Sequence, residues 1–303
     1  MSNIKKAFEH GKAFIPFITC GDPDLKTTAE IIRAAAENGA DLIELGIPFS
    51  DPTAEGPVIQ EANIRALSGG VTTDKIFDMV QELRKDLTIP MVFMTYANVV
   101  YSYRWDGVGG LAVPAGHKER KAEESVQEQR RTDDVQPEES GSSQKPSSGV
   151  AGFIRRCADV GIDGLILPDL PYEEKEEFLP LCRRYGIDLI SLIAPTSKDR
   201  VAAIAKDAEG FIYIVSSLGV TGVRNEIRTD LKSIVDIIRD KTDVPCAVGF
   251  GISRPDQAAS MAAVSDGAIV GSAIIRIIAE HKKDSAPYVG EYIRSMKEAL
   301  RGC

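Results

Sequence analysis

The sequence predicts an α/β fold, and within that class a single (β/α)8 barrel of the TIM type. Short apolar segments alternate eight times with amphipathic stretches whose apolar residues recur at i, i+3 and i+4. This alternation is typical of a (β/α)8 barrel, with a doubly wound open sheet as the alternative. Removing one polar segment of 46 residues, 104–149, from the 303 leaves 257, close to the roughly 250 residues of a typical barrel.

The predicted strands are short and continuously apolar, as expected of strands that are buried on both faces of a parallel sheet. They lie at residues 14–19, 41–46, 90–95, 163–169, 187–194, 210–216, 245–250 and 267–271. The helical patterns lie at residues 26–37, 73–85, 153–160, 173–185, 198–206, 225–239, 255–263 and 288–300. In such a barrel the functional residues are expected in the loops that follow the strands.

Residues 104–149 interrupt this pattern. The segment is rich in Glu, Gln, Ser, Lys, Arg, Gly and Pro and poor in large apolar residues. It therefore predicts a largely disordered insertion after the third strand of one barrel domain, 1–303. Long surface insertions cost little folding free energy, which favours a tolerated insertion or an artefact of the gene sequence. A regulatory or docking segment is the alternative.

The composition predicts a soluble cytoplasmic protein. A net charge of -9 argues against nucleic acid or an anionic membrane as a partner, and no apolar run approaches the about 20 residues that cross a bilayer. The five cysteines include no C-x-x-C pair, which predicts neither a disulfide framework nor a zinc site. None of the three histidines lies at a predicted strand end, so we expect carboxylate chemistry without a metal or cofactor.

Glu44 is the first candidate catalytic residue. It lies inside the buried strand at 41–46, where the side-chain period of two places it on the same face as Leu42. Burying an ionised carboxylate is costly unless a partner or a raised pKa compensates. The residue alone leaves two interpretations open, a core glutamate paired with a lysine or arginine and a catalytic acid or base.

Further candidates follow other strands. Glu55 lies in the Pro/Gly/Asp-rich loop after the second strand, and Tyr213 is expected to point inward from the sixth. The small residues of 217–223 predict a lid that closes and excludes water.

Two glycine-rich strand ends predict a phosphate-binding site. They are Gly249-Phe250-Gly251-Ile252-Ser253 after the seventh strand and Gly271-Ser272-Ala273 after the eighth. Backbone N–H groups at such glycines, and at a helix beginning near Ser272, can bind the anion of a small phosphorylated molecule. Tight turns, with Ser253 as a helix N-cap, explain the same residues without a ligand.

Taken together in this order, the candidate segments resemble the α subunit of tryptophan synthase. The resemblance covers residues 1–103 and 153–303. It rests on Pro16-Phe17-Ile18-Thr19, Gly21-Asp22-Pro23, Glu44-Leu45-Gly46-Ile47-Pro48-Phe49-Ser50-Asp51-Pro52, Gly56-Pro57-x-Ile59-Gln60, Gly219-Val220-Thr221-Gly222, Gly249-Phe250-Gly251-Ile252-Ser253 and Val270-Gly271-Ser272-Ala273. It implies a lyase of tryptophan biosynthesis that cleaves indole-3-glycerol phosphate to indole and glyceraldehyde 3-phosphate.

The resemblance implies a role for each carboxylate. Glu44 would be the catalytic acid and base, because a retro-aldol step adds a proton at indole C3 and removes one from a hydroxyl. The second carboxylate, which accepts a hydrogen bond from the indole N–H, would be residue 55, where the family has Asp and this chain has Glu55. The extra methylene displaces the carboxylate by roughly 1 to 1.5 Å, and such a displacement can cost about a hundredfold in rate.

The resemblance also implies substrate-binding residues and a partner. The implied residues are Phe17, Tyr96, Tyr213 and Phe250 at the indole pocket or its edge, Gly222, Gly251, Gly271 and Ser272 at the phosphate, and Thr221 in the lid. The implied partner is a tryptophan synthase β subunit that receives indole, and the insertion at 104–149 lies beside the expected contact. A stand-alone lyase and a catalytically impaired, phosphate-ligand-binding allosteric subunit are the alternatives.

Overall fold

The computed structural model describes residues 3–104, 148–195, 197–215, 224–249 and 251–303, with the backbone alone described at 224–230. Within these residues, nine strands form one sheet in the order β5-β4-β3-β2-β1-β9-β8-β7-β6. Every neighbouring pair is parallel. The strands are β1 Ala13–Thr19, β2 Ile43–Gly46, β3 Met91–Met94, β4 Gly164–Ile166, β5 Asp188–Leu189, β6 Ser191–Ile193, β7 Ile212–Val215, β8 Cys246–Gly249 and β9 Gly267–Val270.

The sheet closes through its two outermost strands, β5 and β6. Both belong to one stretch of chain that is interrupted only at Ile190. β5 pairs with β4, and Ile190 N continues this contact by donating to Leu165 O at 2.9 Å, whereas β6 pairs with β7. The predicted strand at 187–194 is therefore split between two neighbours, and the predicted (β/α)8 barrel is confirmed.

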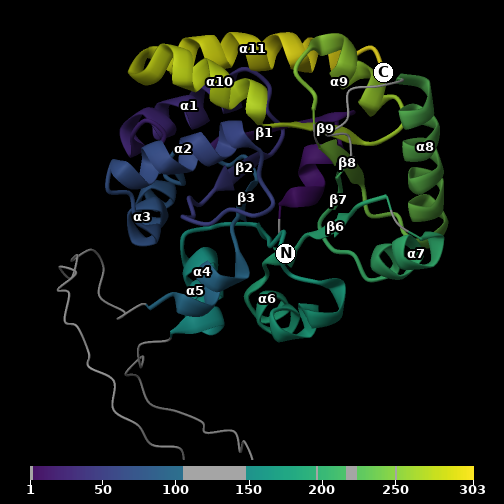
Figure 1. Ribbon diagram of the computed structural model, residues 1–303, viewed down its shortest axis with the longest axis horizontal. Coiled ribbons are helices and arrows are strands. Elements are labelled where there is room, and N and C mark those ends of the chain that lie inside the picture. The colour runs from purple at the N-terminus through teal and green to yellow at the C-terminus, as the bar shows by residue number, and fades with distance from the viewer. Residues whose placement is uncertain (1–2, 105–147, 196, 216–223, 250) are drawn as a thin grey trace, which may run out of the picture.

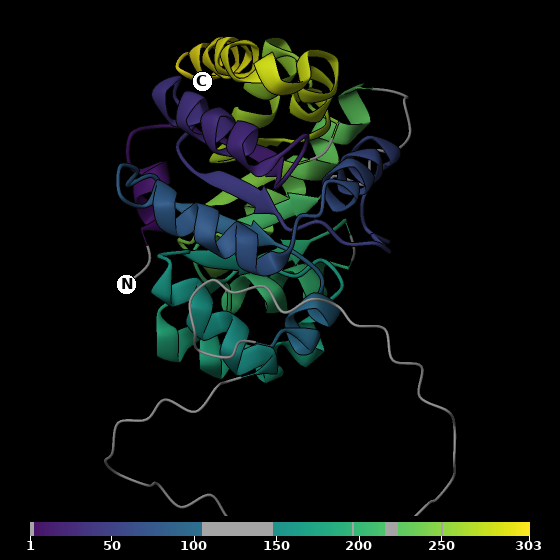
Figure 2. The ribbon, with the colours of Figure 1, turned by 90° about the vertical axis from the view of Figure 1, so that its left-hand side faces the viewer.

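Helices surround the sheet, as Figures 1 and 2 show from two directions. The C-terminal helix α11 packs against both α1 and α9, which joins the two ends of the chain. The α-helices are α1 Leu25–Glu37, α2 Pro57–Ser68, α3 Thr73–Leu83, α4 Ala97–Ser102, α5 Gly149–Asp159, α6 Leu179–Tyr185, α7 Lys198–Lys206, α8 Arg224–Lys241, α9 Pro255–Ala262, α10 Ser272–His281 and α11 Ser285–Leu300. The described residues also form the 3₁₀ helices η1 Ile4–Phe8, η2 Tyr172–Glu177 and η3 Lys282–Asp284.

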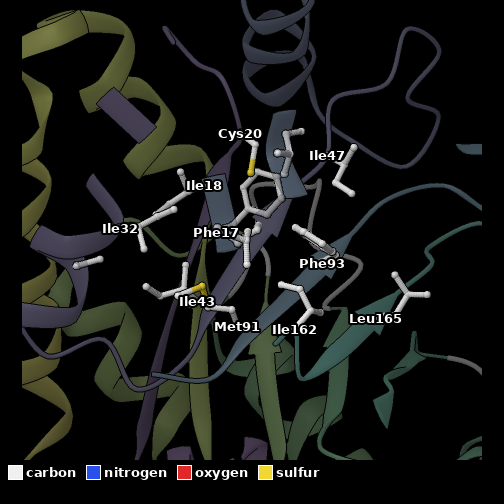
Figure 3. Close-up of a cluster of buried hydrophobic side chains, with 14 of the residues drawn as sticks. Phe17, Ile18, Cys20, Ile32, Ile43, Ile47, Met91, Phe93, Ile162 and Leu165 are labelled. Carbon is white, nitrogen blue, oxygen red and sulfur yellow. The ribbon is translucent and has the colours of Figure 1, made fainter. Parts of the chain in front are cut away.

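The core has two layers, one inside the barrel and one between the sheet and the helices. Inside, Ile15, Leu42 and Phe211 belong to a buried cluster that also includes Ile4 and Ala7 of η1. Outside, alternate strand residues pack against the helices, and Figure 3 shows part of this layer around Ile18, Ile43 and Phe93. The inner layer fills the amino-terminal part of the barrel, which leaves the opposite end for a cavity.

The described ends of the predicted insertion lie side by side. Arg104 forms an isolated antiparallel bridge with Ser148, and Gly149 N donates to Tyr103 O at 2.7 Å. The chain thus leaves and re-enters the barrel at one place. Gly149 begins α5, so the boundary predicted for the insertion includes one residue of the following helix. The predicted disorder of the segment lies outside the described residues, as does the predicted lid at 217–223.

Two helices, α2 and α4, have no counterpart in the sequence prediction. In α2, Ile64 is 64% exposed and Leu67 is also exposed. Apolar residues therefore occur on both faces of this helix, and the periodic pattern of an amphipathic helix is lost. α4 has only 6 residues, which is too short for a periodic signal. Among the described residues, no helix combines the length and the apolar character needed to span a membrane.

Candidate active site

A cavity of about 380 Å³ opens at the carboxyl ends of the strands. Its wall comes from β1, β2, β3, β7 and β9, from the loop between β2 and α2, and from residues 251–253 after β8. The first residues of α2 and of α10 complete it. This is the end of a (β/α)8 barrel where active sites form, because the loops that follow the strands converge there.

Glu44 lies in the wall of this cavity with an isolated carboxyl group. It pairs in register with Phe17 of β1 and Val92 of β3, and only 1% of it is exposed. Within the described part of the chain, neither carboxylate oxygen has a hydrogen-bond partner. Burial, with a smaller contribution from the charge of Glu55, raises the pKa of Glu44 to about 8. The interpretation of a core glutamate paired with a cation therefore finds no support among these residues.

Glu55 lines the same cavity from the loop that follows β2. Asn63 Nδ2 donates to Glu55 Oε2 at 2.7 Å, and Gln60 Nε2 donates to the Glu55 backbone carbonyl at 2.8 Å. Burial raises the pKa of the Glu55 carboxyl, while the Asn63 hydrogen bond acts in the opposite direction. The two carboxyl groups consequently differ, since among the described residues Glu55 has a hydrogen-bond donor and Glu44 has none.

Aromatic rings form much of the apolar wall, and glycines on neighbouring strands make room for them. A Cβ atom at Gly46 would lie 2.5 Å from Phe17 Cζ, and one at Gly249 would lie 2.5 Å from Tyr213 Cε1. Burial, with a contribution from the charge of Glu44, raises the pKa of the Tyr213 hydroxyl well above its usual value. Tyr213 is thus a neutral hydroxyl next to the isolated carboxyl.

The opposite wall carries groups that suit an anion. Gly271 and Ser272 line the cavity at the beginning of α10, where free backbone N–H groups and the helix dipole favour negative charge. Gly251 has a φ of +71° and open space around its Cα, so the backbone can approach a ligand closely. Arg276, one turn further along α10, lines the mouth of the cavity.

The structure brings together seven of the predicted site residues. Phe17, Glu44, Glu55, Tyr213, Gly251, Gly271 and Ser272 all line the cavity. Tyr96 does not; its hydroxyl accepts a hydrogen bond of 3.0 Å from Ala54 N and so supports the loop that carries Glu55. Thr221, Gly222 and Phe250 lie outside the described residues. Ser253 also lines the cavity, whereas the N-cap of α9 is Arg254, which corrects the predicted N-cap.

Sequence reasoning missed Asn63 and Arg276. Asn63 is buried on α2, the helix that the apolar period did not reveal. The one available signal was its spacing, because it lies three residues after Gln60 and so on the same face of any helix that begins at Pro57. Arg276 lies four residues after Ser272, which places it one turn above the expected anion site.

Comparisons with known proteins agree with this geometry. The family model described as tryptophan synthase alpha chain matches residues 2–116 and 146–301, leaving 117–145 unmatched. The chain is 42% identical to the tryptophan synthase alpha chain of Lactiplantibacillus plantarum over 100% of this chain and 97% of the relative, and 41% identical to that of Lacticaseibacillus casei over 99% and 96%.

Solved structures give the same result. The tryptophan synthase subunit alpha of Legionella pneumophila is similar with a TM-score of 0.78 and 32% identity, covering 100% of both chains. A chain of the tryptophan synthase complex of Pyrococcus furiosus is similar with a TM-score of 0.73 and 28% identity, over 94% of this chain and 98% of that one. The chain therefore belongs to the tryptophan synthase alpha chain family.

Proposed function

We propose that this chain is an indole-3-glycerol-phosphate lyase, which cleaves its substrate to indole and glyceraldehyde 3-phosphate in tryptophan biosynthesis. Membership of the family supports this function. The main structural support for this function is the state of the Glu44 carboxyl. It is buried, has no hydrogen-bond partner among the described residues and has a pKa raised to about 8. Such a group can both donate and accept a proton near neutral pH.

The cleavage divides into two proton transfers, both assigned to Glu44. Protonated Glu44 gives its proton to indole C3, and the ring nitrogen becomes positive. The resulting carboxylate then removes the proton from the hydroxyl on the carbon attached to C3. The electrons of that O–H bond form the aldehyde, and the electrons of the C–C bond return to the ring. Indole and glyceraldehyde 3-phosphate leave, and Glu44 is again protonated.

Glu55 is assigned to the positive charge that develops on the ring. Its carboxylate would accept a hydrogen bond from the indole N–H, which stabilises the charge in the transition state more than in the ground state. Phe17 and Tyr213 hold the indole in an apolar cavity, which strengthens this interaction by excluding water.

The phosphate is assigned to the backbone at Gly251, Gly271 and Ser272, beside the beginning of α10. The roles of Thr221, Gly222 and Phe250 stay predictions from the family resemblance. Neither a metal nor a cofactor takes part in this mechanism.

A tryptophan synthase β subunit is the proposed partner, since one of the similar structures is a subunit of the tryptophan synthase complex of Pyrococcus furiosus. The insertion, predicted at 104–149, follows α4 on the side where docking is expected, and the family model leaves 117–145 of it unmatched. We propose that it weakens this docking. All five cysteines are free thiols, which suits the cytoplasm, where we place the complex.

A steady-state assay of the full-length chain, alone and with β subunit, tests this function. The expected result is release of indole and glyceraldehyde 3-phosphate in equal amounts, with a higher rate when β subunit is added. An unchanged rate on addition of β subunit would indicate a stand-alone lyase. Binding of the phosphorylated substrate without turnover under both conditions would contradict the function and indicate an allosteric subunit impaired by Glu55 or by the insertion.

A further inference from the structure

We propose that Asn63 is a positioning residue that holds the Glu55 carboxylate in the orientation required by the indole N–H. The proposal rests on the lyase function, because it assigns a role within that reaction. Asn63 Nδ2 donates to Glu55 Oε2 at 2.7 Å, and only 3% of Asn63 is exposed. A buried donor in contact with a candidate catalytic group can orient that group throughout the reaction.

The face of α2 that carries Asn63 also holds the backbone of Glu55. Gln60 lies three residues earlier, on the same side of the helix. Its side-chain amide donates to Glu55 O at 2.8 Å and to Pro52 O at 3.4 Å. Two amides of one helix thus fix both ends of Glu55, one at the main chain and one at the carboxylate.

The contact matters because the glutamate side chain has three rotatable bonds. An unrestrained Glu loses rotamer freedom when it is ordered, and this entropy loss opposes its ordering by the substrate alone. In the described part of the chain, Asn63 is the side chain that donates to the carboxylate. A helix bound to the loop therefore orders Glu55 before substrate arrives and leaves its second oxygen, Oε1, for the indole N–H.

An amide is chemically suited to this position. It donates a hydrogen bond that favours the ionised carboxylate, yet it adds no positive charge that would cancel the negative charge offered to the ring. The Asn63 hydrogen bond lowers the pKa of Glu55 against the effect of burial, and the charge of Glu55 raises the pKa of Glu44. Asn63 thereby helps to keep Glu55 ionised while Glu44 carries the proton.

Other charged or titratable groups surround Glu55. Glu44 on β2, Tyr213 on β7 and Arg276 on α10 face the same cavity. Tyr96 contacts the loop that carries Glu55, and Asp51 lies in that loop. Burial and neighbouring carboxylates raise the pKa of Tyr96 to about 12. Glu44 is the other carboxyl that lines the cavity, and its pKa of about 8 assigns it to the basic limb of the pH profile, while ionisation of Glu55 is assigned to the acidic limb.

The test compares the pH dependence of kcat for the full-length chain with that of Asn63→Leu, which is similar in size but has no donor. Activity requires ionised Glu55 on the acidic limb and protonated Glu44 on the basic limb. We expect kcat to fall about 10- to 100-fold, KM to change less than about threefold, and the acidic limb to move to higher pH. The basic limb is expected to stay in place.

A second pair of variants first breaks the contact between residues 55 and 63 and then restores it with the two side-chain lengths exchanged. Glu55→Asp shortens the carboxylate by one methylene and breaks the contact, whereas the double variant Glu55→Asp with Asn63→Gln restores the combined length. The acidic limb is expected to move in the single variant and to return in the double variant. Asn38→Leu is the control, because Asn38 is a hydrogen-bonded asparagine at the C-cap of α1 and does not line the cavity. The pH profile of this variant should match that of the parent.

A measurement on the protein without substrate tests the role of Asn63 independently of the lyase function. Titration of the Glu55 carboxyl by ¹³C NMR, assigned by its absence in Glu55→Gln, should show a higher pKa in Asn63→Leu than in the parent. An unchanged titration, or a lower kcat without movement of the acidic limb, would show that Asn63 is only structural. Absence of turnover in the parent chain would instead overturn the lyase function, and the titration would still decide the role of Asn63.

Discussion

At the scale of the residue, the two carboxyl groups of the cavity are made different by their neighbours. Glu44 has no hydrogen-bond partner among the described residues, and its pKa is raised to about 8. Glu55 receives a hydrogen bond from Asn63 that favours its ionised form. Two carboxylates whose environments separate their pKa values are the usual arrangement for dividing acid–base work from charge stabilisation.

The raised pKa of Glu44 has a measurable effect on stability. A carboxyl whose pKa is higher in the folded state stabilises the fold at low pH, and this contribution is lost as pH rises from the usual glutamate value of 4.5 through about 8. The Glu44→Gln variant has no such loss. Its free energy of unfolding should therefore exceed that of the parent increasingly between pH 5 and pH 8, by at most about 5 kcal/mol.

Urea denaturation at several pH values measures this difference. Glu280→Gln, which alters an exposed carboxyl on α10, is the control for the loss of a surface carboxyl. A pH-independent difference for Glu44→Gln would mean that Glu44 is solvated or paired in the folded protein.

The contact between Gly249 and Tyr213 predicts a second effect. An alanine methyl at position 249 would lie 2.5 Å from the Tyr213 hydroxyl oxygen and ring, so the ring must move into the cavity. We expect Gly249→Ala to lower kcat/KM about tenfold or more and to reduce stability by about 1–3 kcal/mol. In a Tyr213→Ala background, where no ring is displaced, the same substitution should have little further effect on either quantity. Equal losses in both backgrounds would contradict the proposed clash.

The residues that sequence could predict are those whose position follows from the strand pattern. Glu44 follows from a period of two within a buried strand, and Gly271 and Ser272 follow from their place after the last strand. The contact of Asn63 with Glu55 could not be predicted, because it depends on how α2 turns back onto the loop. Likewise, the need for glycine at positions 46 and 249 arises from rings on the adjacent strands β1 and β7.

At the scale of the element, the barrel is closed by one stretch of chain that is divided at Ile190 into the strands β5 and β6. The sequence predicts one strand at 187–194, and nothing in its composition indicates that β5 and β6 pair with different neighbours on either side of Ile190. The break is a consequence of closure, since a strand at the seam must meet β4 with its first residues and β7 with its last. Alternation of strands and helices was enough to predict the barrel, whereas pairing at the seam required the structure.

The insertion is a separable element. Its two described ends meet at the Arg104–Ser148 bridge, and Gly149 N is already within hydrogen-bond distance of Tyr103 O. We expect that deleting 104–148 and joining Tyr103 to Gly149 leaves a folded barrel that retains indole release. Removing the entropy of closing a loop of 45 residues should raise the free energy of unfolding by at most about 3 kcal/mol.

Urea denaturation and the indole assay, applied to the parent and to the deletion, measure these two effects. A shorter deletion of 110–142 is the control, since it keeps both ends of the insertion and should give a smaller gain. A deletion that unfolds more easily than the parent would show that the insertion contributes contacts to the barrel.

At the scale of the whole molecule, the two ends of the barrel have separate tasks. The amino-terminal end is filled by apolar residues of the strands and of η1, and the carboxyl end holds the cavity with Glu44, Glu55 and the beginning of α10. The apolar packing and the proposed chemistry therefore lie at opposite ends of the barrel, as in other barrels of this kind. This arrangement explains how the cavity can retain a carboxyl that has no hydrogen-bond partner among the described residues, because the packed core supplies the stability that is lost when Glu44 ionises.

Glu44 is proposed to be both the acid and the base of indole-3-glycerol phosphate cleavage. The most direct test is the rate of indole release by full-length Glu44→Gln at saturating substrate, measured with the affinity for the same substrate. Glutamine keeps the shape of the side chain but cannot exchange the proton, so we expect kcat to fall by about 100-fold to 10,000-fold, with affinity within about threefold of the parent's. If Glu44→Gln releases indole at a rate within about tenfold of the parent's, the assignment of Glu44 as acid and base is wrong.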